Sequence, residues 1–256
     1  MNANEIFLAS IEPLSIGFPG STPASRYAGR AIVSSANSSS SQLSGNFVFH
    51  LAGTGSVALG AVTLTSSGST GGSSSGTLEG YNSTQGTANI PLTGTYTVDA
   101  ATGRVTLSTG AVVPLPLLYL AAPVTGTENI TAFIIGQDPF TLFGLVEPGA
   151  TSAVATNSLA GKYFFGDEFP RDGNAPNRVG IVAIASSGAA TGTEDDSATS
   201  GLSTKSVSYT VNIDNANGFG TGNVGANSVA LTNGTELFFF ANGTGAPASL
   251  TVVEKQ

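Results

Sequence analysis

The chain has 256 residues, a formal net charge of −8 and no cysteine. Its eight Lys and Arg residues are too few to neutralise a row of phosphates, which excludes nucleic acids and anionic lipid surfaces as partners. Without cysteine, neither disulfides nor a Cys-ligated zinc ion can stabilise the fold. The longest apolar stretch, 111–124, contains three prolines and is too short for a helix that spans a membrane.

The first 42 residues resemble the end of a repeat whose beginning is missing. Residues 4–9 are similar to 235–240, and residues 28–33 are similar to a closing segment at 143–146. We therefore predict an N-terminal strand pair, followed by a Ser-rich linker at 34–41 that extends flexibly. Three interpretations stay open: a trimmed piece of a longer repeat protein, a segment that completes a sheet in a neighbouring molecule, or one that pairs back onto its own chain.

Internal repetition is the clearest signal in the rest of the chain. Leu43–Phe49 matches Leu159–Phe165, and Gly60–Gly68 matches Gly180–Gly188. Further on, 96–99 matches 209–212, and Val146-Glu147 matches Val253-Glu254, in the same order. This order indicates two tandem domains, at 43–150 and 151–256.

Each copy is expected to contain about eight short strands and almost no helix. Polar and apolar residues alternate, as in Arg104–Leu107, which is typical of a strand with one face in a core. Asp99–Gly103 and Asp214–Gly218 are predicted hairpin turns. We predict an all-β protein with two antiparallel domains, each a barrel or a two-sheet sandwich, with closure favoured because it removes exposed edges. In the first copy the expected strands are 45–51, 60–66, 75–81, 93–98, 103–108, 115–121, 129–136 and 140–147.

Three resemblances add expectations about location, shape and assembly. The blocks LSGNFVF, GTYTVDAATGR and ENITAFII resemble the Gly/Ser/Thr-rich tandem-repeat exported β-proteins of environmental bacteria, which implies an extracellular or cell-surface location. The opening five residues lack the features of a secretory signal, so either a leader has been removed or the chain is not exported by that route. The strand rhythm resembles that of avidin-like and lipocalin-like barrels, and the plan resembles that of strand-donating filament subunits.

The residues needed for catalysis are missing from the sequence. The single histidine, His50, is interpreted as a surface or rim residue, and its counterpart in the second copy is Gly166. Neither a nucleophile elbow nor a phosphate-binding glycine loop occurs. The acidic residues, including 167–168, 194–196 and Asp214, are interpreted as turn residues. We therefore expect a protein that is not an enzyme.

Modification and metal binding give weaker signals. Five N-glycosylation sequons begin at Asn37, Asn82, Asn129, Asn233 and Asn242, a number expected by chance in a chain so rich in Asn, Ser and Thr. No cofactor is expected. Weak candidates for calcium ligands lie in one turn, at Asp214, Asn215 and Asn217, but the sequence has no bidentate glutamate downstream.

The favoured hypothesis is a structural subunit of an extracellular filament or surface assembly. It would associate with itself head-to-tail by donating its N-terminal strands, with glycans as further covalent partners. The residues expected to mediate self-assembly are Ile6, Phe7, Leu8, Ile11, Ala31, Ile32 and Val33. The alternative is a small-ligand or carbohydrate-binding β-barrel module, with Tyr96, Tyr119, Tyr163 and Tyr209 as candidate lining residues.

Overall fold

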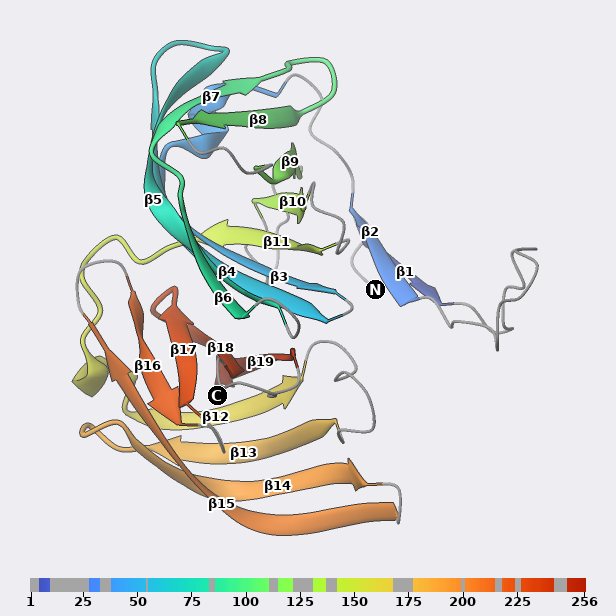
Figure 1. The fold of residues 1–256 in the computed structure, drawn as a ribbon, viewed down its shortest axis with the longest axis vertical. Coiled ribbons are helices and arrows are strands. Elements are labelled where there is room, and N and C mark those ends of the chain that lie inside the picture. Colours follow the sequence, from blue (N-terminus) through green and yellow to red (C-terminus); the bar gives the residue numbers. More distant parts are fainter. Residues whose placement is uncertain are drawn as a thin grey trace.

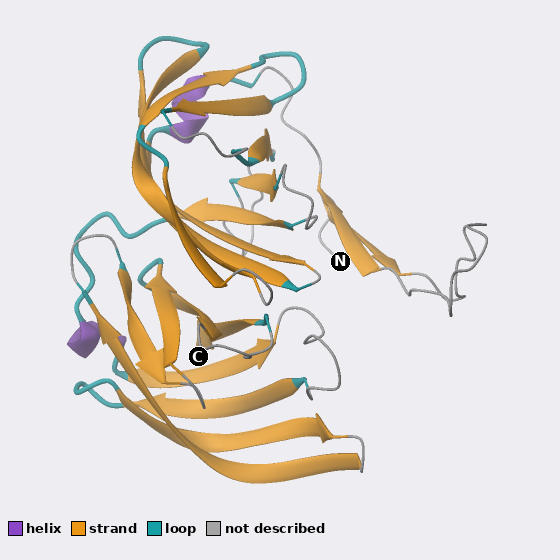
Figure 2. Ribbon diagram, viewed as in Figure 1, coloured by secondary structure: helices purple, strands orange, loops and turns teal. Residues whose placement is uncertain are grey.

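The computed structural model places most of the chain in two consecutive β-barrels (Figure 1). The described residues are 5–9, 28–32, 38–53, 55–82, 86–110, 115–121, 131–136, 142–167, 177–198, 201–214, 218–223, 227–241 and 248–256. Their secondary structure is almost entirely strand, with one short 3₁₀ helix before each barrel (Figure 2). None of the described helices is long and apolar enough to cross a lipid bilayer.

The predicted N-terminal strand pair is present. Strands β1 (Glu5–Ala9) and β2 (Ala28–Ile32) pair antiparallel, with Leu8 opposite Gly29. Among the described strands, these two pair only with each other. Their register is that of the last two strands of the first barrel, where Ile134 lies opposite Gly144.

The first barrel is a meander that closes on itself. Each strand pairs antiparallel with the next one around the ring, and the last strand pairs with the first. Closure decides between the two predicted architectures in favour of a barrel. The elements are η1 (Ser40–Leu43), β3 (Gly45–Gly53), β4 (Ser56–Ser66), β5 (Gly71–Asn82), β6 (Gly86–Pro91), β7 (Gly94–Val98), β8 (Arg104–Thr109), β9 (Leu117–Leu120), β10 (Ala132–Ile135) and β11 (Phe143–Pro148).

Strands β6 and β7 are two parts of one position in this ring. Thr77 of β5 lies opposite Pro91 of β6, and Ser74 lies opposite Gly94 of β7, so the register does not change across the break. The break follows a proline, which cannot donate a backbone hydrogen bond. The predicted strands do not include β6, because Gly, Asn and Pro are depleted in strands.

The second barrel repeats the plan with eight strands. Here a single strand, β15, occupies the position of β6 and β7. The elements are η2 (Thr156–Leu159), β12 (Gly161–Asp167), β13 (Arg178–Ile184), β14 (Ala189–Ala198), β15 (Gly201–Ile213), β16 (Phe219–Asn223), β17 (Asn227–Thr232), β18 (Glu236–Ala241) and β19 (Leu250–Lys255).

Both predicted turns are hairpin turns of this plan. The amide of Asp99 donates to Arg104, and the amide of Asp214 donates to Phe219. Gly103 and Gly218 have positive φ angles of 68° and 75°, a conformation that favours glycine. Because Asp99 and Asp214 open equivalent turns, Tyr96 corresponds to Val211. The predicted match of 96–99 with 209–212 is thus wrong by two residues.

Each barrel has its own apolar core, into which its 3₁₀ helix packs. Leu43 of η1 and Leu159 of η2 are buried in the first and second core respectively. A buried tyrosine hydroxyl donates to each helix: Tyr96 to the carbonyl of Leu43 at 3.1 Å, and Tyr163 to the carbonyl of Leu159 at 2.7 Å. Both tyrosines are therefore core residues.

Candidate functional site

Apolar side chains on the outer surfaces of strands join the two barrels. Neighbouring residues along these strands point into the cores, as expected for strands with alternating faces. We name the outer surface of a barrel's first two strands its first-strand wall, and that of its last three strands its last-strand wall. Members of the buried cluster between the barrels include Val48, Leu59 and Ala61 from the first-strand wall of the first barrel, and Leu231, Phe238, Phe240 and Leu250 from the last-strand wall of the second.

A polar cluster at the same junction fixes His50. Its ring stacks on Phe238 with centroids 4.6 Å apart, and its Nε2 lies 3.2 Å from Glu147. His50 is only 3% exposed, so the interpretation of this residue as a surface or rim histidine is wrong. His50 follows an apolar run in β3, and the outer surface of this strand lies in the contact between the barrels. Asn233 of the second barrel donates from Nδ2 to both Glu147 and Glu236.

The pKa values of the two carboxyl groups in this cluster are shifted in opposite directions. Burial raises the pKa of Glu236 to about 8, and its hydrogen bond with Glu147 and the charge of Glu147 add to this effect. Burial also opposes ionisation of Glu147, but hydrogen bonds from His50 and Glu236 lower its pKa below the ordinary value. At neutral pH, the pair therefore shares one proton, which is held on Glu236.

Pairing registers show which residues of the two barrels are equivalent. In the first barrel, Phe49 lies opposite Gly60 on one side and Val146 on the other. In the second, Phe165 lies opposite Gly180 and Val253. These pairs confirm three of the matched blocks and extend the match along every strand.

Equivalent walls are apolar in both barrels, and two of them are exposed. Val48, Leu59 and Ala61 correspond to Phe164, Val179 and Ile181. Leu231, Phe240 and Leu250 correspond to Tyr119, Ile135 and Phe143. The six residues named first in these two comparisons are buried between the barrels, whereas their six counterparts are 41–58% exposed. Among the described residues, these six are the exposed large apolar side chains.

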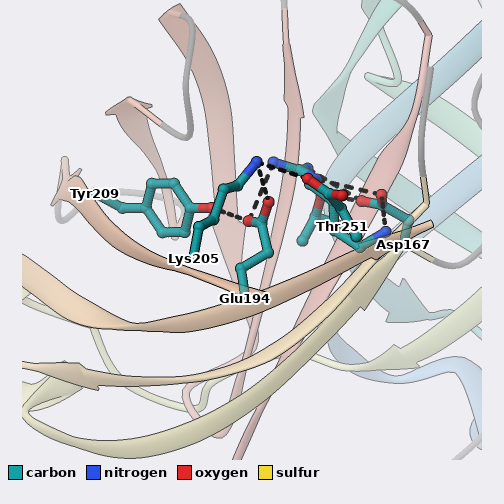
Figure 3. A network of polar contacts seen from close by, with 7 residues as sticks. Asp167, Glu194, Lys205, Tyr209 and Thr251 are labelled. Carbon is teal, nitrogen blue, oxygen red and sulfur yellow. Dashed lines mark hydrogen bonds and ion pairs between the residues drawn. The ribbon is translucent and has the colours of Figure 1, made fainter. Parts of the chain in front are cut away.

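The inside of the second barrel holds a charged network (Figure 3). Arg178 lies at its centre, with Nη2 3.1 Å from Asp167 and 2.9 Å from Thr251. Lys205 places Nζ 3.0 Å from Glu194 and 2.9 Å from Asp196. Tyr209 donates its hydroxyl to Glu194. The carboxylates of Asp167 and Glu194 are at most 1% exposed, whereas the Lys205 side chain is 51% exposed.

These acidic residues contradict the interpretation of 194–196 as a turn. Glu194 and Asp196 lie within β14 and face the barrel interior, and Asp167 ends β12. Consecutive acidic residues are depleted in strands, which explains the error. Their partners Arg178 and Lys205 lie on neighbouring strands, so pairing compensates the cost of burying charge.

The equivalent positions in the first barrel carry no charge. Leu78 occupies the position of Glu194, and Ile90, opposite Leu78, that of Lys205. Asp167, Arg178, Asp196, Tyr209 and Thr251 correspond to Leu51, Ala58, Gly80, Gly94 and Gly144. Leu51, Ala58 and Leu78 belong to the apolar core of the first barrel. The same scaffold therefore closes with and without the network.

The network fixes the protonation states of its tyrosine and of its two basic residues. Burial raises the pKa of Tyr209, and its hydrogen bond to Glu194 raises it further. Burial would lower the pKa of Arg178, but the hydrogen bond and charge of Asp167 raise it above the ordinary value. Hydrogen bonds to Asp196 and Glu194 raise the pKa of Lys205. Tyr209 is thus a neutral donor, and both basic residues are charged.

Two hollows lie near these features. A cavity of about 20 Å³ adjoins Tyr209 and Thr251 inside the second barrel, which is room for about one water molecule. A cleft of about 420 Å³ runs between the barrels beside residues 149–154. Hydroxyl, amide, apolar and backbone groups line this cleft, and none of its lining residues is charged.

The predicted site residues are only partly within the described regions. Ile6, Phe7 and Leu8 lie in β1, and Ala31 and Ile32 lie in β2. Asn233 is a turn residue whose Nδ2, the atom that would carry a glycan, is engaged by two carboxylates. Asn82 ends β5, and Asp214 opens its turn. Predicted residues outside the described regions are Ile11, Val33, Asn37, Asn129, Asn215, Asn217 and Asn242.

The geometry of the described residues gives little support to the alternative ligand site or to the calcium site. Of the four tyrosines, only Tyr209 belongs to the charged network, and Tyr119 lies on the exposed last-strand wall. In the described part of the chain, no three His, Cys, Asp or Glu side chains are grouped so that they could hold a metal ion.

Comparisons with known proteins give no family for the chain. No protein-family model matches it, and no curated protein is similar to it. Among solved structures, the chain is similar to a protein of unknown function from the DUF3598 family of Nostoc punctiforme. The match covers 88% of this chain and 100% of that chain, with 10% sequence identity and a TM-score of 0.23.

Proposed function

We propose that this protein is a non-catalytic structural subunit that associates with itself head-to-tail. The free last-strand wall of one copy packs on the free first-strand wall of the next, as the two barrels pack within one chain. The observation that carries the proposal is that the six exposed large apolar residues occupy positions equivalent to those that form the junction between the barrels.

Continuity with the existing junction supports a second copy of the chain as the partner. Within the chain, Leu59 and Ala61 meet Phe240 and Leu250 in one buried cluster. A second copy offers Val179 and Ile181 in the same places on its first-strand wall. Two different walls meet in this contact, so it is heterologous and leaves one free wall at each end. A contact of this kind grows into a chain of subunits when its rotation does not close a ring.

The contact between copies is expected to be weaker than the one within a copy. Gly166 stands at the position of His50, so the stacking on Phe238 and the bond to Glu147 have no counterpart. The exposed apolar residues are already about half covered, so burying six of them contributes about 1 kcal/mol each. Loss of translational and rotational freedom offsets part of this gain. A net gain of about 4 kcal/mol corresponds to a dissociation constant of about 1 mM, so growth is expected only at about millimolar protein and above.

The test uses one charged substitution on each free wall. Ile181→Lys blocks the first-strand wall and Ile135→Lys blocks the last-strand wall, and both positions are exposed enough for the barrels to fold. The wild-type mass from multi-angle light scattering should rise with concentration, and each variant alone should stay monomeric. An equimolar mixture should stop at dimers, because each variant retains one intact wall.

Ser206→Lys, at an exposed position of β15, is the matched control and should assemble like the wild type. Wild-type protein that stays monomeric at high concentration would refute the proposal. A mixture that forms no dimers, although the wild type assembles, would place the contact elsewhere.

A second kind of contact, strand donation, is favoured by the N-terminal pair. β1 and β2 have the register of the last two strands of a barrel, yet pair with no other described strand. A two-stranded sheet gains stability from additional neighbours. Deleting residues 1–37, which keeps η1, should abolish assembly if donation is the contact, and should leave it unchanged if the walls are sufficient. Light scattering distinguishes these outcomes.

A further inference from the structure

The charged network of the second barrel contains a half-exposed lysine held by buried carboxylates. The ammonium group of Lys205 is bound by Glu194 and Asp196, whose side chains are 1% and 9% exposed. The rest of the lysine side chain reaches into solvent. Its nitrogen can therefore leave without disturbing the packing of the core, whereas the two carboxylates cannot move into water.

The carboxylates have binding capacity that Lys205 does not use. Oδ1 of Asp196 is buried and accepts no hydrogen bond from any described residue. An unsatisfied buried acceptor is costly, and a carboxylate can accept about four hydrogen bonds. Of the two carboxylate oxygens of Asp196, the Lys205 nitrogen contacts Oδ2 and not Oδ1. An untethered ammonium group carries three donors whose directions the protein chain does not fix.

The charge balance also favours a cation. Three carboxylates, of Asp167, Glu194 and Asp196, face two cations, Arg178 and Lys205, which leaves the network with one negative charge in excess. Tyr209 does not change this balance, because it donates to Glu194 as a neutral hydroxyl. At the equivalent positions in the first barrel, this charge does not exist, so closing the barrel does not require it.

We infer that Glu194 and Asp196 form a receptor for a primary ammonium group, and that Lys205 is the occupant supplied by the chain itself. A ligand amine replaces the lysine nitrogen, while the lysine side chain moves into solvent. Arg178 stays in place, because Asp167 and Thr251 hold its guanidinium. This site is independent of the proposed self-assembly.

The experiment removes the built-in occupant and supplies an amine. In full-length Lys205→Met protein, methylammonium chloride should raise the midpoint of thermal unfolding by about 2–4 °C, in a saturable manner. Tetramethylammonium chloride at the same ionic strength should not, because it has no N–H donor. Wild-type protein should need at least about tenfold more methylammonium, because its own lysine competes.

Matched variants on β14 locate the effect. Adding Asp196→Asn to the Lys205→Met protein should abolish the response, whereas Asp195→Asn should preserve it, because Asp195 lies on the opposite face and bonds to Thr204. Equal stabilisation by both salts, or by neither, would overturn the inference.

If the Lys205→Met protein does not fold, the wild type still decides. The Lys205 ammonium resonance in its nitrogen–proton NMR spectrum should shift and weaken as methylammonium is added. A resonance that is unchanged at saturating methylammonium would overturn the inference, and this result does not depend on whether the protein assembles.

Discussion

The two barrels share their outer walls and differ inside. All three compared positions on each wall are apolar in both copies, although only one wall of each barrel is buried within the chain. Inside, Leu78 and Ile90 of the first barrel are replaced by Glu194 and Lys205 in the second. The scaffold therefore tolerates a charged interior, while the apolar exterior is repeated. This contrast suggests that the walls serve contacts and the second interior serves a ligand.

Among variants that test the difference between the two interiors, removal of Arg178 should have the largest effect on stability. Arg178→Ala leaves Asp167 buried with no guanidinium partner, so we expect a loss of about 3–5 kcal/mol of unfolding free energy, measured in urea. As control, all five charged residues are replaced by their counterparts from the first barrel: Asp167→Leu, Arg178→Ala, Glu194→Leu, Asp196→Gly and Lys205→Ile. This variant should stay within about 2 kcal/mol of the wild type. A control as unstable as the single variant would show that the network is needed for folding.

A second substitution compares a buried wall with its exposed counterpart. Phe238→Ala removes a fully buried ring that stacks on His50, and should cost about 3 kcal/mol. The equivalent Phe133→Ala on the free wall should cost about 1 kcal/mol or less in the monomer. Because Phe238→Ala weakens the contact between the barrels, calorimetry should show two separated unfolding transitions for this variant only. Similar losses at both positions would contradict the assignment of the walls.

The carboxyl pair at the junction gives a smaller, pH-dependent effect. The pKa of Glu236 is raised on folding, so the native state holds a proton that the unfolded chain has lost, and stability falls between about pH 4.5 and 8. Glu236→Gln keeps a neutral donor in place. It should raise the unfolding free energy at pH 8 by about 1–2 kcal/mol, after allowance for solvent screening, and leave it unchanged at pH 4. Equal effects at both pH values would exclude titration as the cause.

The smallest expected effect concerns the two helices before the barrels. Tyr96→Phe and Tyr163→Phe each remove one buried hydroxyl that donates to a 3₁₀ helix carbonyl. Each substitution should cost about 1 kcal/mol in urea unfolding, by an equal amount in both barrels. Tyr119→Phe, on an exposed wall, serves as the neutral control. A much larger loss in one barrel would show that the two helices are not equivalent.

Strand alternation, turn residues and duplicated blocks made much of this fold predictable from sequence. The turns at Asp99 and Asp214 illustrate this, since short local patterns of turn residues determine them. The break before Leu92 was not predicted, because the pattern of Gly86–Pro91 is that of a loop. The surrounding ladder with β5 nevertheless holds these residues in a strand.

The candidate sites were harder to predict, because they depend on register rather than on residue type. Gly60 and Gly180 are 120 positions apart, but Leu78 and Glu194 are only 116 apart, since the second hairpin is four residues shorter. Only ladder pairing reveals that these residues are equivalent. For the same reason, the sequence does not show that Glu194 points inward or that His50 lies under the second barrel.

Closure of both rings has a consequence for temperature. Because the strands of each ring already use their backbone groups on their ring neighbours, a joint between walls consists of apolar side chains. Association driven by apolar burial weakens on cooling, unlike a ladder of backbone hydrogen bonds. Assemblies held by these walls should therefore come apart in the cold and re-form on warming, with no change in the barrels themselves.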